Sequence, residues 1–193
     1  MSSATKIAGR VDAAAGAPGA ESAPREGARG SLETLAAEIK ETLGAAWLPR
    51  YYRERILPLR TRSHTLPAGA AKPEQVNVQH TLLGVELKIG RRRITCPDLA
   101  TARYLAVFAR AGCSEVAVPY DISRISLLAD ELESGWQRML LLVEHLAATR
   151  SKTYRTRLRN ALIAEARREI AEAGAGTLIP QFNQNTKQRR RGV

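Results

Sequence analysis

The sequence predicts an α/β (α+β) domain with the element order α-β-β-β-α-β-α-α. Its small mixed or antiparallel sheet contains a β-hairpin and is covered by helices. Two observations carry this prediction. Apolar residues recur at helical spacing near residues 32–43 and throughout residues 98–148, whereas the segment between them contains short runs with a period of two. The chain of 193 residues is 44% hydrophobic but only 5% aromatic, so a single core must be built mainly from aliphatic side chains.

The first predicted helix follows a segment that lacks core-forming residues. Residues 1–30 consist mostly of Ala, Gly, Ser, Pro and scattered charge, which is typical of disorder. We expect Ser31 to cap the first helix, and residues 51–56 to add another helical turn or two after Pro49. Turn-forming residues then predict a loop over residues 60–73.

The sheet is expected to come from the middle of the chain. Residues 76–83, 85–89 and 92–96 are predicted strands, and Gly90 with Arg91 supplies a hairpin turn between the last two. A further short strand is predicted at residues 116–118.

Two helices are expected to cover this sheet. Pro97 and Asp98 begin a helix that is apolar on most of its surface, and Gly112 ends it. Asp121 caps a longer helix that reaches residue 148, in which Gly135 is a local weakness. The globular domain is therefore expected to span residues 31–148.

The longer helix carries a seam of apolar residues spaced three or four apart, a pattern typical of helices that pack against another helix. The seam comprises Ile125, Leu128, Leu132, Trp136, Met139, Val143 and Leu146. It has two interpretations. The seam packs inside the molecule, or Leu128, Leu132, Trp136, Met139 and Val143 form a homodimer or bind a partner helix.

Positive charge collects after residue 148. The formal net charge of the chain is +11, and residues 149–193 contain eleven Lys and Arg against three acids. A basic helix is predicted over residues 149–176, followed by a flexible Arg-rich tail over residues 177–193. This asymmetry favours a polyanionic partner, DNA or RNA. The expected contacts are Arg155, Arg157, Arg159, Arg168, Lys187, Arg189, Arg190 and Arg191, with Arg91, Arg92 and Arg93 as a second patch.

One predicted strand carries a pair of residues with a chemical interpretation. Glu86 and Lys88 are two residues apart, so they share one face of the strand. A carboxylate there could hold Mg²⁺ while the ammonium contacts a phosphate. With Glu74 upstream, and with the order α-β-β-β-α-β over residues 31–119, this part of the chain resembles the PD-(D/E)xK nucleases. The resemblance implies a nuclease in which Glu74 and Glu86 hold Mg²⁺ beside Lys88; the alternative is a solvated strand face.

Other functional classes are not indicated by the sequence. Cys96 and Cys113 lack zinc-ligand spacing and are expected to be buried, and no catalytic triad or nucleotide-binding loop is evident. No apolar stretch predicts a membrane span or a secretory signal, so a cytoplasmic protein without a membrane partner is expected. We expect a non-catalytic nucleic-acid-binding or nucleoprotein-assembly protein without a metal or other cofactor. A Mg²⁺-dependent nuclease and a protein–protein assembly adaptor are the alternatives.

Overall fold

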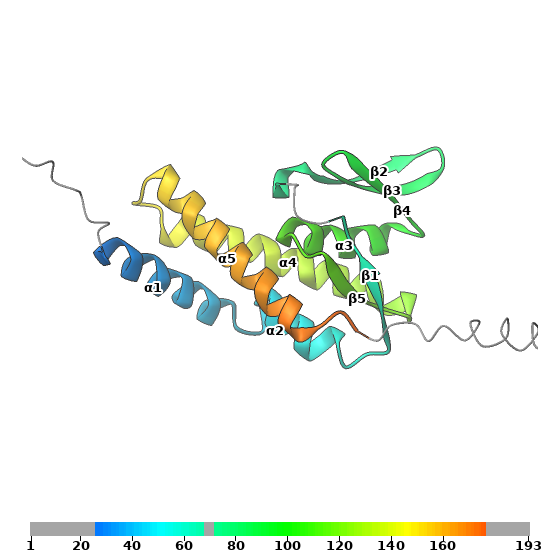
Figure 1. The fold of residues 1–193 in the computed structure, drawn as a ribbon, viewed down its shortest axis with the longest axis horizontal. Coiled ribbons are helices and arrows are strands. Elements are labelled where there is room, and N and C mark those ends of the chain that lie inside the picture. The colour runs from blue at the N-terminus through cyan, green and yellow to red at the C-terminus, as the bar shows by residue number, and fades with distance from the viewer. Residues whose placement is uncertain (1–25, 68–71, 177–193) are drawn as a thin grey trace, which may run out of the picture.

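The computed structural model describes residues 26–67 and 72–176, in which helices and two small antiparallel sheets pack together (Figure 1). The helices are α1 (Glu26–Leu43), α2 (Leu48–Tyr51), α3 (Leu99–Ala111), α4 (Ile122–Leu146) and α5 (Lys152–Ala173). The strands are β1 (Thr61–Thr65), β2 (Val76–Thr81), β3 (Gly84–Ile89), β4 (Arg92–Cys96) and β5 (Glu115–Pro119). Short helical segments η1 (Gly44–Ala46), η2 (Tyr52–Ile56) and η3 (Pro73–Gln75) connect them. The predicted fold class is confirmed.

Helix α1 begins earlier than the sequence indicated. It starts at Glu26, so Ser31 lies within the helix and is not its N-cap. The extension runs through Gly27 and Gly30, which are poor helix formers, so helix propensity did not predict it. The rest of the segment predicted to be disordered, residues 1–25, lies outside the described residues.

Strands β2, β3 and β4 form an antiparallel sheet whose apolar face packs on α3. Val76, Leu87 and Ile89 are buried on that face. The first predicted strand ends at Thr81 and does not reach residue 83. The Thr81 hydroxyl accepts a hydrogen bond from the Leu83 N–H and donates one to the Gly84 carbonyl, and together these bonds close a two-residue turn.

Strand β1 corrects the prediction of a loop over residues 60–73. It pairs antiparallel with β5, from Thr61 opposite Pro119 to Thr65 opposite Glu115, and forms a second sheet with it. The sequence of β1, Thr-Arg-Ser-His-Thr, has no large apolar residue, so it lacks the alternation by which strands are recognised. Burial of β5 supplies the driving force, since Val116, Ala117 and Val118 are 0–1% exposed.

The hydroxyl groups of two buried tyrosines form hydrogen bonds with the backbone N–H and carbonyl of Ala117. The Tyr52 hydroxyl accepts a hydrogen bond from the Ala117 N–H at 2.8 Å and donates one to the Gly174 carbonyl at 2.8 Å. The Tyr104 hydroxyl donates to the Ala117 carbonyl at 2.6 Å. Burial raises the pKa of Tyr52 to about 12, so its hydroxyl remains a neutral donor at physiological pH. Strand β5 thus obtains from side chains the hydrogen bonds that a third strand would otherwise supply.

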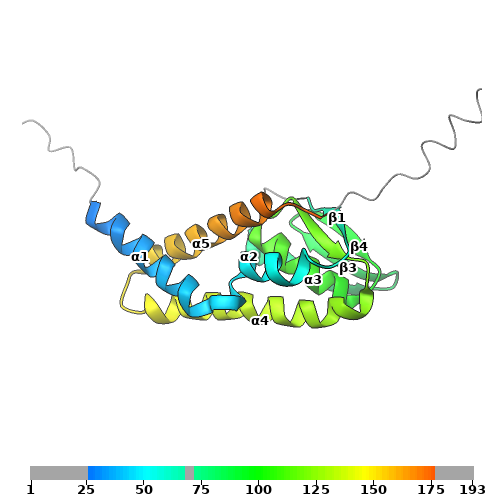
Figure 2. The same cartoon turned by 90° about the horizontal axis from the view of Figure 1, so that it is seen from below.

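Helices α3 and α4 pack against each other (Figure 2), and α3 also contacts the sheet formed by β2, β3 and β4. Asp98 caps α3 and Asp121 caps α4, each by accepting a backbone N–H, and Gly112 ends α3 with a φ of 76°. The prediction that Pro97 begins α3 is wrong, because Pro97 precedes the N-cap Asp98 and lies outside the first helical turn. The first interpretation of the α4 seam fits the structure and the homodimer is not supported, because these residues are buried inside the molecule: Leu128, Leu132, Trp136, Met139 and Val143.

Helix α5 belongs to the same core as the preceding elements. Leu158, Leu162, Ala166 and Ile170 line its buried face and are at most 1% exposed. Ion pairs also tie α5 to the N-terminal segment, since the Lys40 ammonium lies 2.6 Å from Glu165 and the Arg53 guanidinium 2.5 Å from Glu169. The packing therefore does not separate α5 from residues 31–148.

Gly135 permits the closest approach between α4 and η1. A Cβ atom at this position would lie 2.8 Å from the carbonyl oxygen of Ala46. We therefore expect Gly135→Ala to lower the free energy of unfolding by about 1–2 kcal/mol, because the contact outweighs the roughly 1 kcal/mol that alanine contributes to a helix. Urea denaturation measures the change, with Ser134→Ala on the exposed side of α4 as the control. A Gly135→Ala protein more stable than the wild type would contradict this explanation.

Candidate nucleic-acid interface

The three-stranded sheet has one face that α3 does not cover. Figure 1 shows α3 on one side of β2, β3 and β4 and no described helix on the other. Strand periodicity and register place polar side chains there, in two cross-strand rows. This open face comprises Asn77, Lys88 and Arg93 in one row and Gln79, Glu86 and Thr95 in the other.

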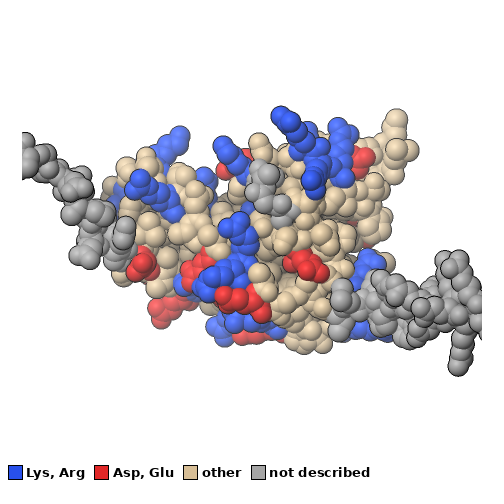
Figure 3. All heavy atoms as spheres, in the orientation of Figure 1, with Lys and Arg blue, Asp and Glu red and all other residues tan. Residues whose placement is uncertain are grey.

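The turn between β3 and β4 adds arginines at one end of the open face. Gly90 adopts a φ of 59°, which lets the chain reverse directly before Arg91. Arg91, Arg92 and Arg93 are all exposed. Figure 3 shows Lys and Arg side chains gathered over this sheet and again over the start of α5. Arg93 thus lies opposite Lys88 on the open face, whereas Arg92 lies opposite Ile89 and points to the other face of the sheet.

Glu86 offsets only part of this charge. Its carboxylate lies 3.6 Å from the Arg93 guanidinium, and its side chain is only 16% exposed. Within the described residues, Lys88, Arg91 and Arg92 have no ion-pair partner. The end of the sheet at Gly90 therefore presents a net positive surface to solvent.

Glu74 does not lie beside Glu86 and Lys88. It lies in η3, with its carboxylate 3.7 Å from the Arg159 guanidinium, and it borders a cavity that also includes Trp136. Glu86 and Lys88 instead project from the open face of β3. The described part of the chain contains no group of three or more His, Cys, Asp or Glu side chains placed to hold a metal ion. Glu74 is thus engaged by Arg159, on a different element from Glu86 and Lys88, and the Mg²⁺ site implied by the nuclease resemblance stays a prediction.

The arginines of α5 do not form one basic face. Arg155 and Arg159 are four residues apart and share a side, whereas Arg157 points away from them and shares its side with Arg168. Acidic groups neutralise three of the four: Arg155 pairs with Glu144, Arg159 with Glu74 and Arg168 with Glu172. The remaining predicted contacts, Lys187, Arg189, Arg190 and Arg191, lie outside the described residues.

Sequence reasoning missed the polar partners of the arginine patch. Asn77 and Gln79 lie on the open face, where their amides can donate to and accept from a ligand. The alternation of Val76 and Val78 with these two residues was the signal, because it fixes which side chains of β2 point away from the core.

The two cysteines are buried and His64 is half-buried. Cys96 and Cys113 are 5% and 3% exposed, as predicted, and burial raises the pKa of the Cys113 thiol to about 12. His64 lies on β1, where burial and the nearby Arg62 lower its pKa. None of these groups adjoins the open face.

The comparisons add no relatives to this description. Among the helices of residues 26–67 and 72–176, none has the length and apolar content needed to cross a membrane. Searches against protein-family models, curated proteins and solved structures found no match to this chain.

Proposed function

We propose that this protein binds nucleic acid without cleaving it, through the open face and the arginines at its end. The observation that carries the proposal is the group of Lys88, Arg91 and Arg92 at the Gly90 end of the sheet, none of which takes part in an ion pair within the described residues. Arginine matches the geometry of a phosphate oxygen pair, and several such contacts release counterions from the nucleic acid. A cytoplasmic location is part of the same proposal.

The composition of the open face favours a duplex. It offers Lys, Arg, Asn, Gln and Thr side chains, which contact phosphates and sugars, but no aromatic ring on which an unpaired base could stack. Tyr154, an aromatic residue of the basic helix, is itself covered by the Arg150 guanidinium, 5.4 Å from the ring centre. Contact with the backbone of DNA or RNA duplexes therefore fits better than reading of single-stranded bases.

The test replaces the three arginines of the patch together. We expect Arg91→Gln, Arg92→Gln and Arg93→Gln in one protein to weaken binding of a labelled duplex at least tenfold in low salt. Because each lost phosphate contact removes about 0.9 from the slope of log K against log salt, the slope should fall by about 2–3. Fluorescence anisotropy across a salt series measures both, with DNA and RNA duplexes of equal length.

A matched control removes the same charge elsewhere. Arg50, Arg60 and Arg124 are exposed, lie outside the patch and are not among the predicted contacts, so replacing all three with Gln should change the slope by less than about 1. Equal losses in the two triple variants would show that only total charge matters. Wild-type binding that does not respond to salt would overturn the proposal.

A further inference from the structure

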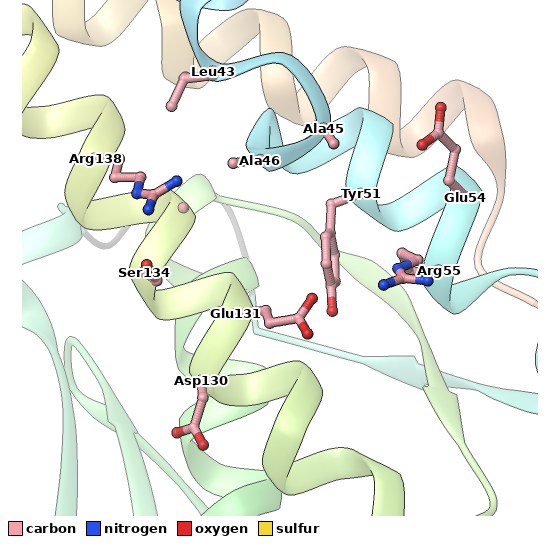
Figure 4. Close-up of a pocket in the computed structure, with 11 residues that line it drawn as sticks. Leu43, Ala45, Ala46, Tyr51, Glu54, Arg55, Asp130, Glu131, Ser134 and Arg138 are labelled. Carbon is pink, nitrogen blue, oxygen red and sulfur yellow. The ribbon is translucent and has the colours of Figure 1, made fainter.

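A cavity separates α4 from the segment that contains η1, α2 and η2. Its volume is about 550 Å³, which is in the size range of small-molecule sites. Leu43, Ala45 and Ala46 provide apolar lining, while Tyr51, Arg55, Glu131, Ser134 and Arg138 provide polar groups (Figure 4). The close approach of Gly135 to Ala46 holds the two sides together.

Two arginines in this cavity lack acidic partners. Of the acids that line it, Glu54 pairs with Arg50 at 2.8 Å and Asp130 pairs with Arg103 at 2.8 Å. Within the described residues, neither Arg55 nor Arg138 takes part in an ion pair. Figure 4 shows these two guanidinium groups at opposite ends of the cavity, one beside η2 and one on α4. Each end of the cavity therefore carries an arginine that takes part in no ion pair within the described residues.

A carboxylate lies between these two arginines. Figure 4 shows the Tyr51 hydroxyl and the Glu131 carboxylate turned toward each other. Burial, followed by the neighbouring Glu131 carboxylate, raises the pKa of Tyr51 above its usual value, so the phenol stays protonated. A carboxylate accepts more than one hydrogen bond, so Glu131 can accept one from a ligand hydroxyl or amine.

We propose that this cavity binds a small organic dianion, meaning a molecule with two anionic groups (carboxylate or phosphate), one at Arg55 and the other at Arg138, and with a hydroxyl or amine that donates to Glu131. Guanidinium groups bind carboxylates and phosphates through paired hydrogen bonds, so the shared chemistry covers hydroxydicarboxylates and phosphorylated hydroxyacids. The site is separate from the open face and does not depend on nucleic-acid binding.

The test uses calorimetric titration of the full chain with malate, 3-phosphoglycerate and lactate. We expect at least one of the two dianions to bind, and lactate, which has a single anionic group, to bind at least tenfold more weakly. Preference for malate or for 3-phosphoglycerate distinguishes a carboxylate from a phosphate at the second arginine. No measurable heat with either dianion at about 10 mM would overturn the proposal.

Single substitutions assign the binding to this cavity. We expect Arg55→Gln and Arg138→Gln each to weaken dianion binding at least tenfold, and Arg157→Gln, an exposed arginine outside the cavity, to leave it unchanged. An equal loss in Arg157→Gln would point to non-specific charge and contradict the site. Thermal unfolding of the ligand-free variants checks that they remain folded. The triple variant at Arg91, Arg92 and Arg93 should keep full dianion affinity, so this inference and the proposed function can fail separately.

Discussion

A chain that ends at Ala148 is expected to lose cooperative folding. The deletion removes Leu158, Leu162 and Ile170, each at most 1% exposed, from the core. Burial of three such side chains is worth about 5–9 kcal/mol, which is comparable to the whole stability of an ordinary domain. The deletion also removes Gly174, whose carbonyl accepts the hydrogen bond from Tyr52.

Circular dichroism during urea denaturation measures this loss. A chain that ends at Gly176 keeps all of α5 and serves as the control, and we expect it to unfold in one transition. A sharp transition in the chain that ends at Ala148, at the midpoint of the control, would show that α5 is not required by the core. Because removal of α5 disturbs folding, substitution of individual arginines is the better way to study its charge.

Tyr52→Phe is expected to produce the second-largest effect. Loss of one hydroxyl leaves two backbone groups without their partner, the N–H of Ala117 and the carbonyl of Gly174. The Ala117 N–H is buried and costs about 1–3 kcal/mol when it is unsatisfied, whereas Gly174 is exposed and its carbonyl can bond to water, so we expect the free energy of unfolding to fall by about 1–3 kcal/mol. The phenyl ring still fills the same space, so little of the loss should come from packing.

Urea denaturation of matched Tyr→Phe variants isolates the hydrogen bonds. Tyr104→Phe leaves one buried group, the Ala117 carbonyl, without its partner and should cost about as much as Tyr52→Phe. Tyr120→Phe, at a residue that is 41% exposed, should change stability by less than about 0.5 kcal/mol. Equal stability of the wild type and Tyr52→Phe would mean that water replaces the lost hydroxyl.

Features of the fold that depend on local chemistry were predictable from the sequence. Asp121 caps α4 because its carboxylate accepts a backbone N–H two residues ahead, and Gly112 ends α3 because glycine adopts a positive φ without strain. The buried seam on α4 could be predicted from its spacing, but the spacing could not say whether the facing helix was α3 or a second molecule.

Features that depend on long-range contacts were not predictable. Strand β1 is polar and forms only because it pairs with β5, some fifty residues later. Nothing in the sequence around Tyr52 indicates a hydrogen bond to Ala117. Gly135 resembles a defect in a helix until its approach to Ala46 is known.

The candidate sites were likewise predictable only where their residues are neighbours in the sequence. The run of Arg91, Arg92 and Arg93 is contiguous, so its grouping on the surface could be predicted. Arg157 and Arg159 are also close in sequence, but helix geometry sends them to different sides, and Glu74 neutralises only Arg159. Arg55 and Arg138 line the same cavity, at opposite ends. The segments that form this cavity are far apart in the chain, so the sequence gives no signal that these two residues belong to one site.

The hairpin tip between β2 and β3 offers a practical handle. Leu82 and Leu83 are 105% and 88% exposed, and the Thr81 hydroxyl rather than either leucine holds the turn. Exposed loop tips of this kind tolerate added sequence well. A fluorophore or short epitope attached here would report on the sheet without disturbing its packing, and would lie at the end opposite the arginines.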